Sequence, residues 1–462
     1  MLSASEWAIQ QWGQADLGDR RLTRRAVEVG AKMAAHPEAS LPEQMQDPAA
    51  LEGAYRLLNH AYVSMQDLLA PHMQQTRRMA EQCVLVLWVE DTTELDYTAH
   101  AAKTGLGSIG NEKGRGLLLH SALAVVPEGR QVLGLAHAQV VRREPAPKPK
   151  PHWTRSAESR VWEVSAQAVG RPPAGCVWVH VSDRASDIFE YMGTCVDLDK
   201  HFLLRVHHNR LLSWEAQAPQ AEQEEAHKIV DYARSLPEQP HSSYTVEVPA
   251  RAGQPARQAQ LALAWAPVTV APPAQAPPAI RHHPPLNLWL LRAWEPDAPL
   301  GVEALEWILL CSLPVILLPE AQRTTQWYAQ RWLCEDFHQC LKTGCRIEHS
   351  QLDAGTDIER LLGFAAPIAV RLLQLRQAAR QAPEVPARHI VDPLMVEVLA
   401  RRYHLQAEAM TAQVFWRRVA SLGGFQGRRH DGNPGWRTVW RGWRYLSDLT
   451  EGARLFAPID TS

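Results

Sequence analysis

The stretch CVLVLWVEDTTEL, residues 83–95, decides how the rest of the chain is interpreted. Its first half is an almost unbroken run of aliphatic and β-branched residues, which predicts a strand buried on both faces of a sheet. The run ends abruptly in acidic and hydroxyl residues, the second of which is Asp91. We therefore expect a central strand that carries a carboxylate at its end.

The segments that follow predict a mixed α/β sheet. GRGLLLHSALAVV (114–126) and QVLGLAHAQVVRR (131–143) are two further strands, and the short turn between them makes an antiparallel meander. A helix at 154–170, a strand that runs into a helix at 176–192, and a strand at 201–206 come next. The order β-β-β-α-β-α-β places helices on the faces of the sheet.

A β-rich insertion interrupts this plan over about residues 207–312. Apparent strands occur in YTVEVPA (244–250), AQLALAWAPVTV (259–270), NLWLLRAW (287–294) and LEWILLCS (305–312). The proline-rich tract at 270–285 reads as a loop within the insertion rather than as a linker, because strands resume directly after it.

Both ends of the chain read as helical. The N-terminal helix LGDRRLTRRAVEVGAKMAAH (17–36) has an apolar spacing and a basic cluster at Arg20, Arg21, Arg24 and Arg25, which suits a solvated face or contacts with DNA phosphates. The last 70 residues form a further helical unit. Its Trp436, Trp440 and Trp443, interleaved with arginines, suit core packing or an interface.

Composition bounds the class of protein. The 462 residues are 46% hydrophobic and 21% charged, and no apolar run approaches the ~18 residues of a membrane span. The start lacks the features of a signal peptide, so we expect a cytoplasmic protein. Net charge is only −2, which excludes a uniformly basic surface. The seven cysteines include no CxxC pair and indicate small core residues rather than disulfides.

Three carboxylates are candidates for one metal-dependent site. Asp91 and Asp183 each follow a predicted buried strand, and neighbouring strand ends lie close together in a sheet. Glu335 lies in WYAQRWLCEDFHQCLKTG (327–344), a predicted helix, and would be the third. Alone, Asp183 is more typical of a helix cap. Together, three carboxylates would repel one another unless divalent cations such as Mg²⁺ or Mn²⁺ lay between them.

The same helix carries a stripe of polar groups beside Glu335. On a helical wheel, Tyr328, Arg331, Glu335 and Lys342 fall within about 60° of one another at ~100° per residue. An arginine fork and a lysine charge are suited to holding phosphates. The stripe therefore predicts a phosphodiester bound next to a metal ion.

The spacing Y-x2-R-x3-E-x6-K resembles the YREK signature of the IS-four family of bacterial DDE transposases, and of its Tn-five branch most of all. The similarity extends to EGAYRLLNH (52–60), VEDTTELDY (89–97), LGSIGNEKGRGLLLHS (106–121), VSDRASDIFEY (181–191), VRLLQLR (370–376), and to LGGF and WRGW near the end. It implies an RNase H-like catalytic core with a β-rich insertion, flanked by helical N- and C-terminal domains.

What the resemblance implies is a cut-and-paste transposase. Asp91, Asp183 and Glu335 would hold two Mg²⁺ ions, for which Mn²⁺ can substitute. The resemblance assigns DNA contacts to Tyr328, Arg331 and Lys342 and base stacking to Trp307, and we expect further contacts from Arg205, Arg20, Arg21 and Arg24. The domains would be residues 1–75 for transposon-end binding, 76–365 for catalysis and 366–462 for dimerisation. The partners would be double-stranded DNA, both terminal repeats and target, and a second copy of the chain in a synaptic complex, with no membrane. The protein would associate with the bacterial nucleoid when bound.

The sequence departs from the family pattern in the insertion and in the helix that carries Glu335. YTVEVPARAGQPARQAQLALAW carries few charges, RVHHNR has His207 and His208 where a more basic pair is expected, and Gln339 stands where the Tn-five branch has lysine. These differences affect the grip on DNA and the end sequence that is recognised.

Other functions remain open from the sequence. A zinc site could be drawn from Cys334, His338, Cys340, Cys345 and His349, although no tight knuckle exists. Paired carboxylates also suggest a glycosidase, but that function gives Arg331 and Lys342 no task. A catalytically silent DNA-binding inhibitor or domesticated remnant could keep the fold, and a metal-dependent nuclease could cut DNA without joining it.

Overall fold

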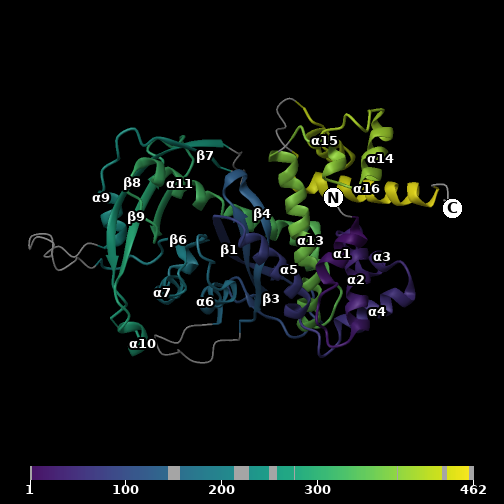
Figure 1. The fold of residues 1–462 in the computed structure, drawn as a ribbon, viewed down its shortest axis with the longest axis horizontal. Coiled ribbons are helices and arrows are strands. Elements are labelled where there is room, and N and C mark those ends of the chain that lie inside the picture. The colour runs from purple at the N-terminus through teal and green to yellow at the C-terminus, as the bar shows by residue number, and fades with distance from the viewer. Residues whose placement is uncertain are drawn as a thin grey trace, which may run out of the picture.

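The structure is a computed structural model, and it describes residues 3–143, 157–212, 228–248, 257–274, 276–381, 383–428 and 434–456. In Figure 1 the N- and C-terminal helices lie together on one side of the molecule. The strands of the insertion lie on the opposite side, at the far edge of a large sheet. No helix in these ranges is long and apolar enough to cross a membrane.

One mixed sheet runs through the described part of the molecule. Its strands are β1 (Leu85–Asp96), β2 (Gly107–Ile109), β3 (Gly114–Val126), β4 (Gln131–Val141), β5 (Val177–Ser182), β6 (His201–Arg205), β7 (Tyr244–Val248), β8 (Arg257–Val270), β9 (Leu286–Trp294) and β10 (Glu306–Cys311). The order is β2-β3-β1-β5-β6-β10-β9-β8-β7, with β4 also paired to β3. Strands β1, β5 and β6 are parallel to one another, whereas β3 is antiparallel to β1 and β4. The predicted mixed α/β sheet is confirmed.

The insertion extends this sheet instead of forming a separate one. Strand β10 pairs antiparallel with β6, and β9, β8 and β7 follow outward. The predicted strands of the insertion are all present where the structure describes them. Outside the insertion, β2 is an additional short strand that pairs with β3. The proline tract contains the short helix α10 (Pro278–Arg281). Residues 213–227 and 249–256 lie outside the described residues.

Two helices cover one face of the central strands. These are α6 (Ala157–Val169) and α7 (Phe189–Asp197), and a third helix, α9 (Ile229–Ser235), contacts β9. Their apolar side chains, among them Trp162 and Phe189, form a second core on that face together with strand residues such as Phe202 of β6. The predicted start of the first helix, residues 154–156, lies outside the described residues.

The N-terminal helices pack on the long helix α13 (Gly355–Gln381). They are α1 (Ala4–Trp12), α2 (Arg20–Ala35), α3 (Leu41–Met45), α4 (Pro48–Leu58) and α5 (Met65–Ala80). Ser3, Ser40 and Ser64 begin three of them with capping boxes. Trp12 is fully buried and its indole N–H donates to the Gly363 carbonyl oxygen at 3.3 Å.

The C-terminal helices are α14 (Pro393–Tyr403), α15 (Ala412–Leu422) and α16 (Trp436–Leu455). Trp443 stacks on Trp416 at 5.3 Å, and Trp440 is also buried, so these tryptophans belong to the core. The side chain of Trp436 lies outside the described residues. The domain boundary predicted at 365/366 falls within α13, which both parts of the molecule therefore share.

Candidate active site

Asp91 lies in the middle of β1, not at its end as predicted. Parallel pairing of β1 with β5 stops at Val89, but antiparallel pairing with β3 continues to Asp96. Thr92, Thr93 and Glu94 continue the strand because they pair with β3, and their half-exposed positions tolerate polar residues. Asp91 therefore lies just past the point where β1 and β5 separate.

Asp183 follows β5 directly, as predicted. Its carboxylate accepts a hydrogen bond from the Ala185 amide at 2.9 Å, so it also caps the 3₁₀ turn Arg184–Ser186. Asp183 therefore caps this turn and also lies near Asp91. The negative charge of Asp183 is close enough to raise the pKa of Asp91.

The segment that carries Glu335 is kinked. Helix α11 (Leu318–Ala329) ends before Arg331, α12 (Trp332–Gln339) follows, and a π-helical turn spans Cys340–Gly344. At the junction the amides of Gln330 and Arg331 bond three residues back, as in a 3₁₀ turn. The prediction of one straight helix over 327–344 is wrong in this respect.

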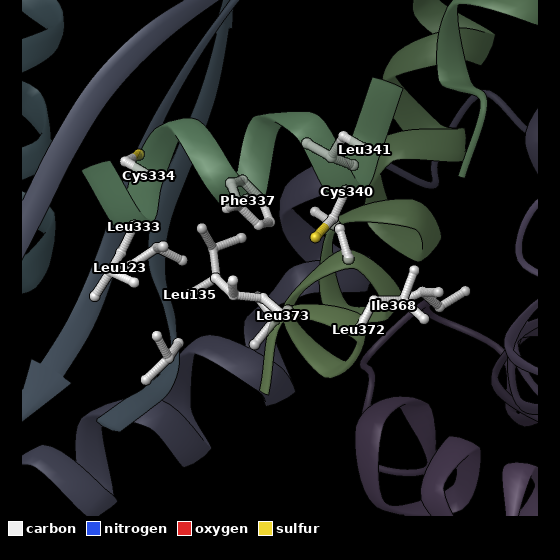
Figure 2. Packing of buried hydrophobic residues seen from close by; sticks show 14 of the residues in the cluster. Leu123, Leu135, Leu333, Cys334, Phe337, Cys340, Leu341, Ile368, Leu372 and Leu373 are labelled. Atoms are coloured by element: carbon white, nitrogen blue, oxygen red, sulfur yellow. The ribbon is translucent and has the colours of Figure 1, made fainter. Parts of the chain in front are cut away.

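Packing fixes α12 over the β1–β3 pair. Leu333, Phe337 and Leu341 belong to one core cluster, and Figure 2 shows the first two pointing toward Leu123 and Leu135 of the sheet and toward Leu373 of α13. These three side chains are buried, which leaves Glu335 on the exposed side of the helix.

Contacts with β3 fix the position of α12 on the sheet. Ser121 pairs with Asp91 in the β1–β3 register, and its hydroxyl and carbonyl oxygens lie 3.3 Å from His338 Nε2 and 3.6 Å from Cys334 Sγ. Glu335 is thereby held on the same face of the sheet as Asp91.

Arg331 links two of the three carboxylates. Its Nη1 donates to Asp91 Oδ2 and its Nη2 to Glu335 Oε1, each at 2.7 Å. The side chains of Arg331 and Asp91 are 13% and 16% exposed, and that of Glu335 is 49% exposed. Burial raises the pKa of Asp91 to about 6; Arg331 opposes this shift, while Asp183 and Glu335 add to it. Asp183 and Glu335 therefore both lie near enough to Asp91 to act on its charge.

The aromatic members of the predicted DNA-binding set are buried. Trp307 is 5% exposed and meets Tyr328 edge to face at 5.1 Å, and Trp332 lies 6.3 Å away. Burial raises the pKa of Tyr328, although Arg331 and Arg205 lower it. Arg205 donates to the Glu306 carbonyl oxygen at 2.7 Å. Any stacking of a DNA base on Trp307 requires that this cluster open.

Lys342 does not contact Asp91, Asp183 or Glu335. The π-helical turn rotates it away, and its Nζ lies 3.6 Å from Glu348 Oε1, which also accepts from the Asp96 amide. The stripe predicted for a straight helix is therefore divided, with Arg331 and Glu335 at Asp91 and Lys342 at the far end of β1. No pattern in the sequence indicates Glu348 as its partner.

The basic cluster of α2 is exposed. Arg20, Arg21 and Arg24 lie on the solvent side of the first helical turns, and Arg21 and Arg24 pair with Asp19 and Glu28. The opposite side is buried through Ala26, Val29 and Met33.

Four side chains below the site, Glu90 and its three hydrogen-bond donors, were missed by the sequence interpretation. Glu90 is fully buried on the opposite face of β1 from Asp91, where it accepts from Ser165 Oγ at 2.7 Å, His180 Nδ1 at 2.9 Å and the Tyr191 hydroxyl at 3.1 Å. Burial would raise the pKa of Glu90, but His180, His120 and the hydrogen bond from Ser165 lower it to about 2. The sequence feature that indicates this buried group is a glutamate within the otherwise apolar run 85–90.

The donor set of the site fits a hard divalent cation, because all three candidates are carboxylates. As the side chains stand, no three His, Cys, Asp or Glu residues in the described ranges are close enough together to hold a metal ion. Arg331 occupies oxygens of two of the candidates. The cysteines and histidines proposed as zinc ligands, all of which are described, do not gather either.

Two comparisons with protein families bear on the class of protein. A family model described as "Transposase DNA-binding" matches residues 4–63, and one described as "Transposase Tn5 dimerisation domain" matches residues 367–459. The two matches support a DNA transposase that binds DNA and forms dimers. More particularly, they support a Tn5-like transposase family.

A solved structure is also similar to the chain. It is the cryo-EM structure of the piggyBac transposase synaptic complex with hairpin DNA, at 10% identity and a TM-score of 0.34, over 98% of this chain and 79% of that one. A similarity of this size carries no weight for the fold or function.

Proposed function

We propose that the chain is a cut-and-paste DNA transposase with an RNase H-like core and a catalytic triad of Asp91, Asp183 and Glu335. The observation that carries the proposal is that Arg331 bridges Asp91 and Glu335, while Asp183 is near enough to raise the pKa of Asp91, in a chain with two segments that match transposase families. The YREK spacing adds to this support.

The proposed reaction is a series of phosphoryl transfers at the transposon end. Hydrolysis of one strand frees a 3′-OH, which attacks the opposite strand and closes a hairpin. Water reopens the hairpin, and the 3′-OH then attacks a phosphodiester of target DNA. Each step exchanges one oxygen for another at phosphorus, so no oxidant or nucleotide is needed.

Each residue of the proposed site has a separate task. Asp91, Asp183 and Glu335 would hold two Mg²⁺ ions, or Mn²⁺, whose chemistry is to activate the attacking oxygen and to stabilise the leaving one. Arg331, Arg205 and Lys342 would bind phosphates through their charges.

The remaining roles concern DNA outside the reacting phosphate. Tyr328 would orient the phosphate beside Arg331, and Trp307 would stack on an extruded base once its cluster opens. Arg20, Arg21 and Arg24 on α2 would contact the terminal repeat. The C-terminal helices would pair two copies of the chain across two ends.

An excision assay tests the proposal and separates it from the alternatives. A plasmid carrying the repeats that flank the gene is incubated with the protein and Mg²⁺, and the products are resolved under denaturing conditions. We expect hairpin ends, followed by insertion into a second plasmid. Cleavage without joining would indicate a nuclease, and binding of the ends without cleavage would indicate a silent inhibitor or remnant.

A further inference from the structure

Arg331 is held in place by more than its two ion pairs. It stands at the kink between α11 and α12, where its own amide donates to the Tyr328 carbonyl oxygen at 3.1 Å and its carbonyl oxygen accepts from Cys334 at 2.9 Å. The side chain is 13% exposed. Because both the backbone and the side chain of Arg331 are hydrogen-bonded, its guanidinium is not a freely moving surface charge.

The guanidinium divides its donors between two carboxylates. Nη1 is bound to Asp91 and Nη2 to Glu335, so one arginine bridges residues that are 244 positions apart in the chain. Burial would lower the pKa of Arg331, but Asp91 first and then its other acidic neighbours raise it, so the group stays charged. The bridge neutralises the negative charge that would otherwise attract a cation.

A divalent cation needs the same oxygens. It requires lone pairs of Asp91 and Glu335, and Arg331 holds a lone pair of each. The cation and the guanidinium would also repel each other at this distance. In the arrangement that the structure shows, the guanidinium therefore competes with a cation for Asp91 Oδ2 and Glu335 Oε1 and opposes it by charge.

We propose that Arg331 is a latch that keeps divalent cations from the carboxylates until DNA is bound. A DNA phosphate offers the guanidinium a fork of two oxygens in exchange for Asp91 and Glu335. Release of the carboxylates then admits the cation. Because binding free energies are reciprocal, DNA raises the affinity for metal by the factor by which metal raises the affinity for DNA. This inference rests on the proposed function, since it assumes that the carboxylates bind metal.

The test measures Mn²⁺ affinity without DNA, from the electron paramagnetic resonance signal of free Mn²⁺ during a titration of the full chain. We expect Arg331→Ala to bind Mn²⁺ about tenfold to a hundredfold more tightly than the wild type, the equivalent of one lost charge-assisted hydrogen bond. Arg331→Lys keeps the charge but cannot span both carboxylates, so its affinity should lie between the two. Circular dichroism confirms that each variant is folded.

Two controls separate the latch from simpler effects. Arg184 is exposed, follows Asp183 and makes no side-chain hydrogen bond or ion pair with Asp91, Asp183 or Glu335, so Arg184→Ala removes a nearby charge without freeing an oxygen. It should change Mn²⁺ affinity by about twofold or less. Asp91→Asn should lower the affinity in both the wild-type and the Arg331→Ala background.

The outcomes distinguish the latch from the proposed function. If Asp91→Asn weakens Mn²⁺ binding but Arg331→Ala leaves it unchanged, the latch is wrong and the metal site stands. If Arg331→Lys matches the wild type, charge alone acts and the latch is also wrong. If Asp91→Asn has no effect, the metal site itself is wrong.

A second titration tests the coupling to DNA. A duplex carrying the flanking repeats should raise the Mn²⁺ affinity of the wild type by a larger factor than that of Arg331→Ala, because the variant has no latch to release. Equal factors for the two proteins would overturn the coupling.

Discussion

Removal of the Glu90 carboxylate should destabilise the core beneath the candidate site. Glu90 is fully buried and accepts hydrogen bonds from Ser165, His180 and Tyr191. In Glu90→Leu these three donors lose their acceptor in a space that water does not reach. Breaking a buried, charged network of this kind costs roughly 3–5 kcal/mol of the free energy of unfolding.

A conservative variant separates the charge from the shape. Glu90→Gln keeps one acceptor oxygen for His180 and Ser165, and the Tyr191 hydroxyl can rotate to accept from the new amide. Since charge-assisted bonds are about twice as strong as neutral ones, we expect a smaller loss of about 1–2 kcal/mol.

Urea unfolding followed by tryptophan fluorescence measures both free energies. Trp162 lies 6.2 Å from Tyr191 and reports on this core. The order wild type, Glu90→Gln, Glu90→Leu is the expected result. A Glu90→Leu variant within about 0.5 kcal/mol of the wild type would refute the reasoning, because ordinary surface substitutions already reach that range.

Three further predictions concern other parts of the chain. Burial lowers the pKa of His72 to about 4, so as the pH falls the unfolded state takes up this proton before the folded state does. The free energy of unfolding should therefore fall by up to about 3 kcal/mol between pH 6.5 and 4. His72→Gln should flatten this pH dependence, and an unchanged pH dependence would contradict the assignment. A Cβ at Gly442 would lie 1.7 Å from a backbone oxygen of α15, so Gly442→Ala should lose about 1–3 kcal/mol in urea unfolding, whereas Gly452→Ala, with open space around it, should not; equal stability of both would show that α15 and α16 are not in close contact. Arg24→Ala should weaken binding to the terminal repeat and reduce the salt slope by about one, while Arg56→Ala on α4 should do neither in the same electrophoretic titration; identical slopes would move the DNA contact away from α2.

Much of the central sheet could be predicted because its strands are local signals. The β-branched run before Asp91 and the strand before Asp183 are each recognisable from composition, and parallel pairing then brings their ends together. The length of β1 beyond Asp91 was not predictable. It depends on pairing with β3, which no property of the segment TTELD reveals.

The break in the segment around Glu335 has a tertiary cause. Helical periodicity continues through residues 327–344, but α12 must place Phe337 against α13 and Cys334 against β3 at once. The 3₁₀ junction and the π-helical turn accommodate both contacts, and they separate Lys342 from Arg331. Burial of Trp307 against Tyr328 likewise follows from this packing rather than from its own neighbours in sequence.

The central claim is that Asp91, Asp183 and Glu335 form one centre for phosphoryl transfer. A matched set of variants tests it most directly: Asp91→Asn, Asp183→Asn and Glu335→Gln beside Asp336→Asn, whose carboxylate follows Glu335 but faces Arg376 of α13 at 2.8 Å. The measurement is the rate of Mg²⁺-dependent cleavage at the terminal repeat, with end binding as the control for folding.

We predict that the three triad variants bind the end but cleave it at least about a hundredfold more slowly, a barrier increase of about 3 kcal/mol, while Asp336→Asn stays close to the wild type. Cleavage by all four variants at the wild-type rate would contradict the claim and place the active site elsewhere in the chain.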